Sequence, residues 1–170
     1  MAVPGFFAIA ALATMLSAYS GASSSQGASP EQPVHFPHPT HVQKLGMNCL
    51  YCHYTANKSP DPGLPAMSTC MGCHNLVATN KPEIKKLAGF AAKGQPVPWV
   101  RIHKLPEYVH FPHMRHVNAG VSCQTCHGAI QNMKQVGQNA PLNMGWCVSC
   151  HTGVSNPPFK ARYDCAVCHY

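Results

Sequence analysis

The stretch Cys49-Leu-Tyr-Cys52-His53 decides how this chain folds, because its pattern of two spaced cysteines followed by histidine occurs five times. The other copies are Cys70-Met-Gly-Cys73-His74, Cys123-Gln-Thr-Cys126-His127, Cys147-Val-Ser-Cys150-His151 and Cys165-Ala-Val-Cys168-His169. All 10 cysteines of the 170-residue chain belong to these copies. Each copy therefore supplies two thiols and one imidazole as a unit, and no cysteine remains for a separate disulfide framework.

This spacing predicts covalent haem attachment. Two thiols that are two residues apart reach both vinyl groups along one edge of a porphyrin, and the adjacent imidazole then binds the iron. A zinc ribbon or a thioredoxin-like redox pair also uses paired cysteines, but neither needs histidine directly after the second one. We therefore expect five haem c groups, with thioether bonds to Cys49, Cys52, Cys70, Cys73, Cys123, Cys126, Cys147, Cys150, Cys165 and Cys168, and proximal ligands His53, His74, His127, His151 and His169.

Seven histidines remain as possible sixth ligands of the irons, and neutral imidazole suits iron well. They are His35, His38, His41, His103, His110, His113 and His116. Met144 is the alternative sixth ligand, since a His/Met haem has a higher potential than a bis-histidine haem. Its other role would be packing over a porphyrin face, which suits a thioether. Met67 precedes the second motif at the same distance and has the same two readings.

An internal repeat organises the chain after residue 33. His35-Phe-Pro-His38-Pro-Thr-His41 recurs as His110-Phe-Pro-His113-Met-Arg-His116, and two cysteine motifs follow each copy. The repeat predicts two di-haem units followed by a fifth motif within one pentahaem domain. The expected boundaries are about 34–80 and 103–152 for the repeat units, 165–169 for the fifth motif and 34–170 for the domain.

The N-terminal residues 1–22 contain no charged side chain. As a helix they would span about 33 Å, which is enough to cross a bilayer core. A cleaved secretory signal is the alternative, but no Lys or Arg precedes the apolar stretch as such signals require. We expect an N-terminal transmembrane anchor, followed by a flexible polar linker over 23–33 that is rich in serine and proline.

The rest of the chain predicts short helices among loops. Its 16 prolines and 13 glycines leave little room for long helices. One helix is expected from Pro82, a favourable first-turn residue, through Lys93. The predicted fold class is mostly irregular and α-helical, with short helices and loops wrapped around five closely packed haems that supply most of the core.

The basic charge of the chain does not indicate nucleic-acid binding. Twelve Lys and Arg against five Asp and Glu give a formal charge of +7. Each ferric bis-histidine haem adds roughly one negative charge through its propionates, so five haems would bring the total to about +2. The basic side chains are better explained as partners for propionates.

The pattern Phe-x-His-x-x-His before a cysteine motif resembles that of the class III multihaem cytochromes. In that family the first histidine binds the haem of the motif just downstream, and the second binds a different haem. The resemblance implies that His38 serves the haem of Cys49 and that His113 serves the haem of Cys123. His41 and His116 would then reach haems elsewhere in the protein.

A longer resemblance runs through Pro98-Trp-Val-Arg-Ile-His103-Lys-Leu-Pro-Glu-Tyr-Val-His110-Phe-Pro-His113-Met-Arg-His116-Val-Asn-Ala-Gly-Val-Ser-Cys123 and continues in Leu142-Asn-Met-Gly-Trp-Cys147. These stretches are similar to the pentahaem, membrane-anchored cytochrome c subunit of alternative complex III, a bacterial quinol-oxidising complex. That family usually has histidine at position 103 and commonly an aromatic residue at position 110. The resemblance therefore implies the distal ligands His38, His41, His103, His113 and His116, and it leaves His35 and His110 near propionates.

The same resemblance implies a single-pass membrane protein with its haem domain on the periplasmic side. Its expected partners are integral-membrane quinol-binding subunits and an iron–sulfur/molybdopterin-like subunit. The electron acceptor would be a soluble cytochrome c or copper protein, or a terminal oxidase. The chain itself would be an electron relay without catalytic residues.

Three other functions stay open at this point. A stand-alone membrane-anchored quinol dehydrogenase would need a proton acceptor near the membrane, for which Glu31 and His35 are the candidates. A multihaem reductase would need an open iron position, whereas candidate sixth ligands outnumber the predicted haems. A soluble periplasmic shuttle would require removal of residues 1–22.

Overall fold

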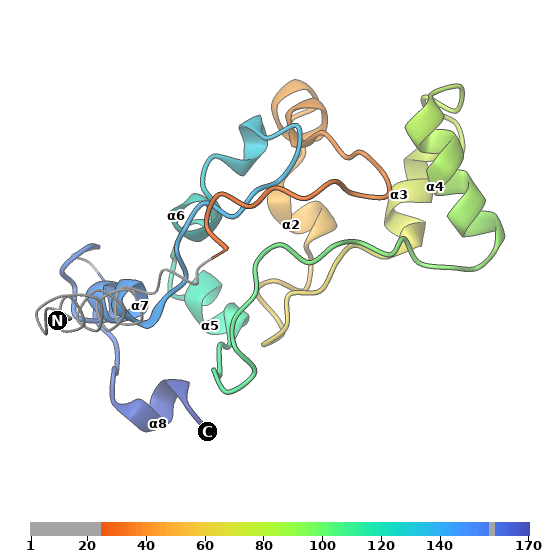
Figure 1. Cartoon of the computed structure of the whole chain (residues 1–170). Coiled ribbons are helices and arrows are strands. Elements are labelled where there is room, and N and C mark those ends of the chain that lie inside the picture. The colour runs from red at the N-terminus through yellow and green to blue at the C-terminus, as the bar shows by residue number, and fades with distance from the viewer. Residues whose placement is uncertain (1–24, 157–158) are drawn as a thin grey trace, which may run out of the picture. The chain divides into compact units, whose positions relative to one another are not determined.

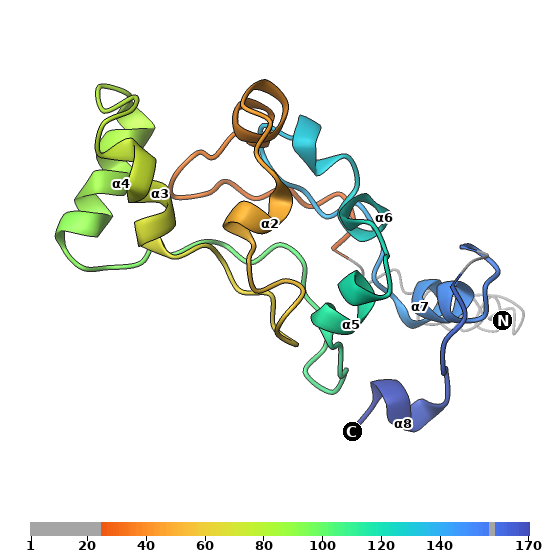
Figure 2. The same ribbon diagram turned by 180° about the vertical axis from the view of Figure 1, so that it is seen from behind.

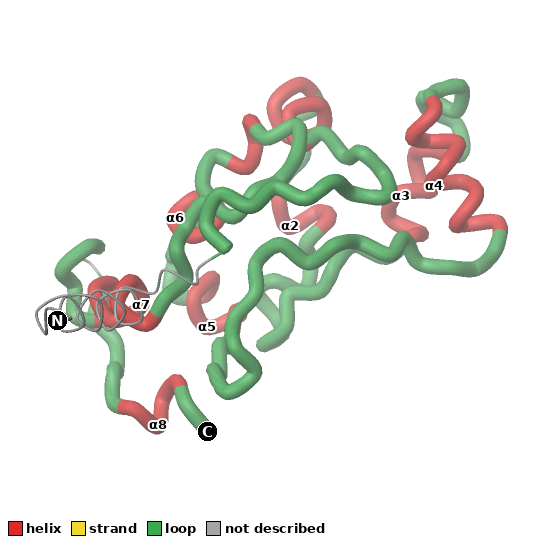
Figure 3. The backbone as a smooth tube through the Cα atoms, in the orientation of Figure 1, coloured by secondary structure: helices red, strands yellow, loops and turns green. Residues whose placement is uncertain are grey.

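The computed structural model describes residues 25–156 and 159–170. Within these ranges the chain is helical and irregular with no strand, and loops join short helices (Figure 3). One isolated antiparallel bridge joins Val109 and His169. The helices are η1 (Pro39–Lys44, a wide π-type turn), α2 (Cys49–Cys52), α3 (Met67–His74), α4 (Pro82–Ala92), α5 (His113–Asn118), α6 (Cys123–His127), η2 (Ile130–Asn132), α7 (Met144–His151) and α8 (Cys165–Cys168) (Figure 1). The expectation of short helices within an irregular chain is confirmed.

The described chain divides into two compact units. The larger unit comprises residues 27–104 and 111–139, and the smaller one comprises 25–26, 105–110 and the described residues from 140 onward. The larger unit therefore contains the cysteine motifs of α2, α3 and α6, and the smaller one contains those of α7 and α8. The boundary between the two compact units falls inside the second predicted repeat unit, about 103–152, because each compact unit is made of segments that are distant in sequence.

Local sequence signals explain where several helices begin and end. The Asn48 side chain accepts a hydrogen bond from the Leu50 amide at 2.8 Å, which caps α2 at its start. Asn143 caps α7 in the same way through the Trp146 amide, also at 2.8 Å. Pro82 opens α4, and Gly94 follows its last turn with φ of +62°. The helix predicted from Pro82 is thus confirmed.

A small apolar cluster holds α4 against α3, and the two helices lie side by side in both views (Figures 1 and 2). Leu87 of α4 is buried there with Val34 and Val97. Among the described residues no large side chain is fully buried. The polypeptide therefore provides only a modest core, and the partly buried neighbours of the cluster are Met67, Cys70, Met71, Phe90 and Trp99.

Residues 27–32 of the predicted linker are hydrogen bonded to other segments of the larger unit, and the linker over 23–33 stays a prediction. The Gly27 amide donates to the Gln138 carbonyl at 2.7 Å, and the Gln138 amide donates to the Ala28 carbonyl at 3.0 Å. The Gln32 side chain accepts from the Val100 amide at 2.9 Å and donates to the Val100 carbonyl at 3.1 Å. These contacts satisfy backbone groups on both segments.

The predicted anchor, residues 1–22, lies outside the described residues, together with the first two residues of the linker. In the part of the chain that the structure describes, no helix is long and apolar enough to cross a membrane. The anchor and the membrane location remain expectations of the sequence.

Candidate haem-binding sites

All five cysteine motifs lie on single helical turns, which brings the two thiols of each motif to one side. Motifs one, three and five form α2, α6 and α8, and the other two lie in the second halves of α3 and α7. None of the ten thiols forms a disulfide. Burial is the largest cause of the raised thiol pKa at Cys52, Cys70, Cys123 and Cys147, so these side chains stay protonated. A protonated thiol is the group that adds across a vinyl double bond.

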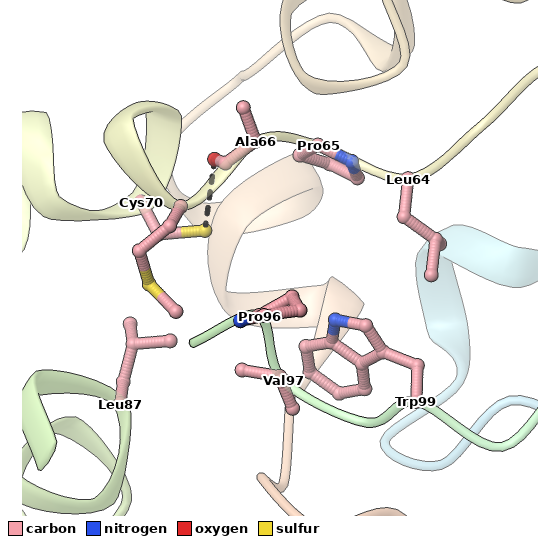
Figure 4. Close-up of a pocket in the computed structure, with 9 residues that line it drawn as sticks. Leu64, Pro65, Ala66, Cys70, Leu87, Pro96, Val97 and Trp99 are labelled. Carbon is pink, nitrogen blue, oxygen red and sulfur yellow. Dashed lines mark hydrogen bonds between the residues drawn. The ribbon is translucent and has the colours of Figure 1, made fainter. Parts of the chain in front are cut away.

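An apolar cavity of about 270 Å³ opens beside the Cys70 thiol in the larger unit (Figure 4). Pro65 and Cys70 lie along one wall, and Val97 and Trp99 lie along the other. The cavity offers apolar contact at the point where a porphyrin edge would be attached. The residues around this motif therefore fit haem c.

Backbone hydrogen bonds orient two of the proximal histidines for metal binding. Nδ1 of His74 lies 3.0 Å from the Val77 carbonyl, and Nδ1 of His151 lies 2.6 Å from the Arg162 carbonyl. A carbonyl accepts only, so Nδ1 carries the proton in each ring and Nε2 is the nitrogen with the lone pair. This arrangement is typical of histidines that bind a metal through Nε2.

The same device recurs at three of the predicted distal ligands. Nδ1 of His41 lies 3.3 Å from the Pro37 carbonyl, and Nδ1 of His116 lies 3.2 Å from the Pro112 carbonyl. Nδ1 of His113 lies 2.9 Å from the Ala56 carbonyl, on the loop after α2. The corresponding bonds of His41 and His116 show that the sequence repeat is also a repeat of local structure.

The phenylalanines of the repeat have a role that sequence reasoning missed. The Phe36 ring stacks on His41 with centroids 4.4 Å apart and planes inclined by 20°. The Phe111 ring stacks on His116 at 4.3 Å and 30°. Each phenylalanine thus supports the last histidine of its segment, His41 or His116. The Phe-x-His-x-x-His spacing was the signal that could have predicted this stacking.

Two histidine pairs have the separation of axial ligands on one iron. Each nitrogen would lie about 2.0 Å from the metal and each ring centroid about 1.2 Å further out, so the centroids would be about 6.4 Å apart. The His41 and His74 centroids are 6.1 Å apart. The His113 and His127 centroids are 6.4 Å apart. Both pairs combine a proximal histidine with a predicted distal one.

Burial favours the neutral form of four histidines of the larger unit, and the neutral form is the one that binds iron. Desolvation, followed by the nearby rings of His53 and His41, lowers the pKa of His38 to about 4. Desolvation, followed by the rings of His103, His113 and His53, lowers the pKa of His127 to about 4. The same burial lowers the pKa of His53 and of His103.

His38 and its neighbour His53 fit the first haem. The Nδ1 atom of His38 is buried and has no hydrogen-bond partner among the described residues. The ring of His53 lies close enough to His38 to contribute to the lowered pKa of His38. An orphaned imidazole nitrogen in this position has the chemistry of a metal ligand. His38 therefore lies close to His53 of the first motif, and the resemblance assigns His38 to the haem of that motif.

His127 differs from the motif histidines His74 and His151, because its Nδ1 lies close to another histidine rather than to a backbone carbonyl. Its Nδ1 lies 3.3 Å from Nε2 of His103, and the two ring centroids are only 4.3 Å apart at 73°. This separation is too short for an iron atom between the rings. His103 and His113 are therefore both close to His127, but at different distances.

In the smaller unit the segment before Phe111 pairs with the fifth motif. The His110 amide donates to the Cys168 carbonyl at 2.7 Å, and Nδ1 of His110 lies 2.9 Å from the Tyr170 hydroxyl. The Tyr108 ring stacks loosely on His169, with centroids 5.9 Å apart. Met144 is 67 % exposed at the start of α7. The axial partners of His151 and His169 remain predictions.

His35 lies on the surface, and its backbone amide donates to a carboxylate oxygen of Glu83 at 2.6 Å. Lys86 and this amide lower the pKa of Glu83, and a salt bridge of 2.7 Å joins Lys86 to the carboxylate. The structure thus gives the His35 backbone a hydrogen bond to α4.

Thiols of different motifs also lie close together within each unit. Besides burial, Cys70 and Cys73 raise the pKa of Cys52, and Cys49 raises that of Cys123 through charge repulsion first and a side-chain hydrogen bond second. In the smaller unit Cys168 raises the pKa of Cys147. Haems attached at these cysteines would be close neighbours.

Comparisons with known proteins agree with this chemistry. The family described as cytochrome c7 and related cytochrome c matches residues 109–170. The multihaem cytochrome c subunit of the menaquinone reductase of Nitratidesulfovibrio vulgaris (Hildenborough) is 35 % identical over 165 residues, spanning 82 % of this chain and 77 % of the relative. With this coverage and with motifs that fit haem c, the chain belongs to the multihaem cytochrome c family.

Proposed function

We propose that this chain carries five haems c and relays electrons between a quinone-binding membrane partner and a soluble carrier or terminal oxidase. The observation that supports it best is the pairing of His41 with His74 at 6.1 Å and of His113 with His127 at 6.4 Å. Irons with two protein ligands have no open position for a substrate. The chain would then move electrons without being an enzyme by itself.

The polypeptide sets the conditions of the relay, while haem supplies the one-electron chemistry. Histidines would hold the irons, and hydrogen bonds from Nδ1 to backbone carbonyls would fix the ring orientations at His41, His74, His113, His116 and His151. The closeness of Cys49 to Cys123, and of Cys147 to Cys168, supports short distances between haems within each unit. Short distances are what fast electron hopping requires.

The link to quinone rests on relatives and on the N-terminal sequence. A chain 35 % identical to this one is named as a subunit of a menaquinone reductase. We propose that residues 1–22 anchor the chain as a single span, with the haem domain on the periplasmic side. The partners would be integral-membrane quinone-binding subunits and an iron–sulfur/molybdopterin-like subunit, as in alternative complex III.

The direction of electron flow has two candidates. The resemblance to alternative complex III favours oxidation of quinol, with electrons leaving to a soluble cytochrome c, a copper protein or a terminal oxidase. The name of the relative favours the opposite direction, from a periplasmic donor to menaquinone. Both candidates use the same chain of haems, so the direction depends on the potentials of the partners.

Native membranes from the source organism test the proposal. We would solubilise them in mild detergent, separate complexes on a native gel, stain for haem and identify the co-migrating polypeptides. Co-migration with polytopic subunits and an iron–sulfur/molybdopterin-like subunit is expected. Migration alone with quinol oxidation retained would overturn the subunit assignment and indicate a stand-alone quinol dehydrogenase.

The excised band then decides the direction. Adding a reduced menaquinol analogue should reduce the haems, as followed by their visible absorbance, if the complex oxidises quinol. Reduction of added menaquinone by the pre-reduced complex, without haem reduction by menaquinol, would establish the opposite direction. If neither quinone species exchanges electrons with the haems, the quinone link itself is wrong.

A further inference from the structure

His127 of the third motif has histidine neighbours on two sides, and the two contacts differ in kind. The ring of His113 is 6.4 Å away between centroids, the separation expected across an iron atom. The ring of His103 is 4.3 Å away, and its Nε2 lies 3.3 Å from Nδ1 of His127. The distance between Nε2 of His103 and Nδ1 of His127 is that of a long hydrogen bond, and it is too short for a metal ion to lie between the two nitrogens.

The nitrogen that His103 contacts is Nδ1, and a haem iron would be held by the other ring nitrogen, Nε2. His74 and His151, from two other copies of the motif, place Nδ1 on backbone carbonyls and so leave Nε2 for the metal. Because all copies share one spacing, His127 should also bind iron through Nε2. Nδ1 of His127 then carries the proton, which it donates to Nε2 of His103.

The segment that carries His103 is fixed by its own contacts. The Arg101 side chain donates to the His103 carbonyl at 3.2 Å, and both the amide and the carbonyl of Val100 pair with Gln32. The His103 ring is half-buried. These contacts hold the segment that carries the acceptor in place.

We propose that His103 is a positioning residue for the proximal ligand His127, and that His113 is the sixth ligand of the haem at Cys123 and Cys126. His103 takes the place that a backbone carbonyl has at His74 and His151. An imidazole acceptor at this position makes His127 a more electron-rich ligand, which favours ferric over ferrous iron. The haem of the third motif would thus have a lower potential than the same haem without His103.

This assignment departs from the ligand set implied by alternative complex III, which includes His103. The last sixth-ligand position would then fall to His110 or Met144, which both belong to the smaller unit. The proposal rests on haem attachment at the third motif, which is part of the proposed function, but it does not depend on the quinone link.

The test uses the full-length, haem-loaded protein and four variants. His103→Ala removes the acceptor, and His103→Gln restores an acceptor oxygen near the position of Nε2. His113→Ala shows what loss of an axial ligand looks like. His35→Ala is the matched control, because this histidine is exposed and the backbone amide that donates to Glu83 remains in the variant. The readouts are haem content by mass, spin state by low-temperature electron paramagnetic resonance, and midpoint potentials by redox titration.

We expect every ferric haem of His103→Ala to stay low-spin, with one midpoint potential raised. A tenfold loss of ferric over ferrous preference corresponds to about 59 mV for a one-electron couple. His103→Gln should bring this midpoint potential most of the way back to the wild-type value. His113→Ala should produce one high-spin haem. His35→Ala should match the wild-type chain.

A high-spin haem in His103→Ala or His103→Gln would show that His103 is an axial ligand and would overturn the proposal. Unchanged potentials in His103→Ala, or no high-spin haem in His113→Ala, would overturn it as well. If His103→Ala does not accumulate, the spin state of His103→Gln decides in the same way. A wild-type chain without haem on Cys123 and Cys126 would instead show that the proposed function fails at this motif.

Discussion

Replacing His41 by alanine tests the ligand geometry where the structure defines it most clearly. The His41 and His74 centroids are 6.1 Å apart, close to the roughly 6.4 Å expected for two imidazoles on one iron. Alanine removes the distal ring and leaves the helical turn of α3 and its thiols untouched. The iron held by His74 should lose its sixth ligand while its covalent attachment persists.

The expected size of the effect follows from the count of motifs. One of five haems changes, so about a fifth of the ferric haem should become high-spin, since a single imidazole no longer gives a strong ligand field. Phe36→Ala provides a graded comparison because the Phe36 ring stacks on His41 at 4.4 Å. An aromatic contact of this kind contributes about 0.5–1.5 kcal/mol, so this variant should keep all haems low-spin.

Electron paramagnetic resonance of the oxidised, purified protein is the assay, with haem content measured on the same samples. His35→Ala serves as the control, because its side chain is exposed and its tether to Glu83 is made by the backbone. A fully low-spin spectrum for His41→Ala at normal haem content would refute the pairing of His41 with His74. A high-spin signal in His35→Ala would show that the assignment of bystanders is wrong.

Three further predictions concern the polypeptide. Leu87→Ala should lower the stability of α4 by about 2–5 kcal/mol, seen as faster hydrogen exchange in that helix, and unchanged exchange would show that the apolar cluster does not hold it. Asn143→Ala should cost α7 about 1 kcal/mol, so the Trp146 amide should exchange about fivefold faster, and an unaltered rate would argue against the cap. Because its partners lower the pKa of Glu83, the tether to His35 should be complete above the ordinary carboxyl pKa and weaken as pH falls through the lowered value. Glu83→Gln should remove this pH dependence from the protection factor of the His35 amide, which is its exchange rate relative to an unstructured peptide at the same pH. A protection factor that still changes with pH in the variant would contradict the role of the carboxylate.

Much of the local structure could be predicted from the sequence. The cysteine motifs fall on helical turns because their chemistry requires two thiols on one side, and Pro82 opens the one longer helix. The repeat of Phe-x-His-x-x-His became a repeat of contacts, with each phenylalanine stacked on the second histidine. These features depend on residues that are close in sequence.

The features that the sequence did not predict depend on distant contacts. The described residues of the serine- and proline-rich linker look flexible by composition, yet Gln32 and the 27–29 segment hydrogen bond to residues about 70 and 110 positions away. The position of His103 at Nδ1 of His127 depends on how the loop that carries His103 meets helix α6. Spacing alone could not distinguish such a neighbour from a sixth ligand.

The central claim is that the chain holds five covalent haems, and the mass of the intact protein tests it most directly. The protein would be produced in a host with cytochrome c maturation, unfolded in acid and measured by electrospray mass spectrometry. The account predicts the polypeptide mass plus five haem groups that acidic organic solvent does not extract, with haem-modified peptides from every motif. Fewer than five covalent haems, or a motif recovered with both thiols free, would contradict it.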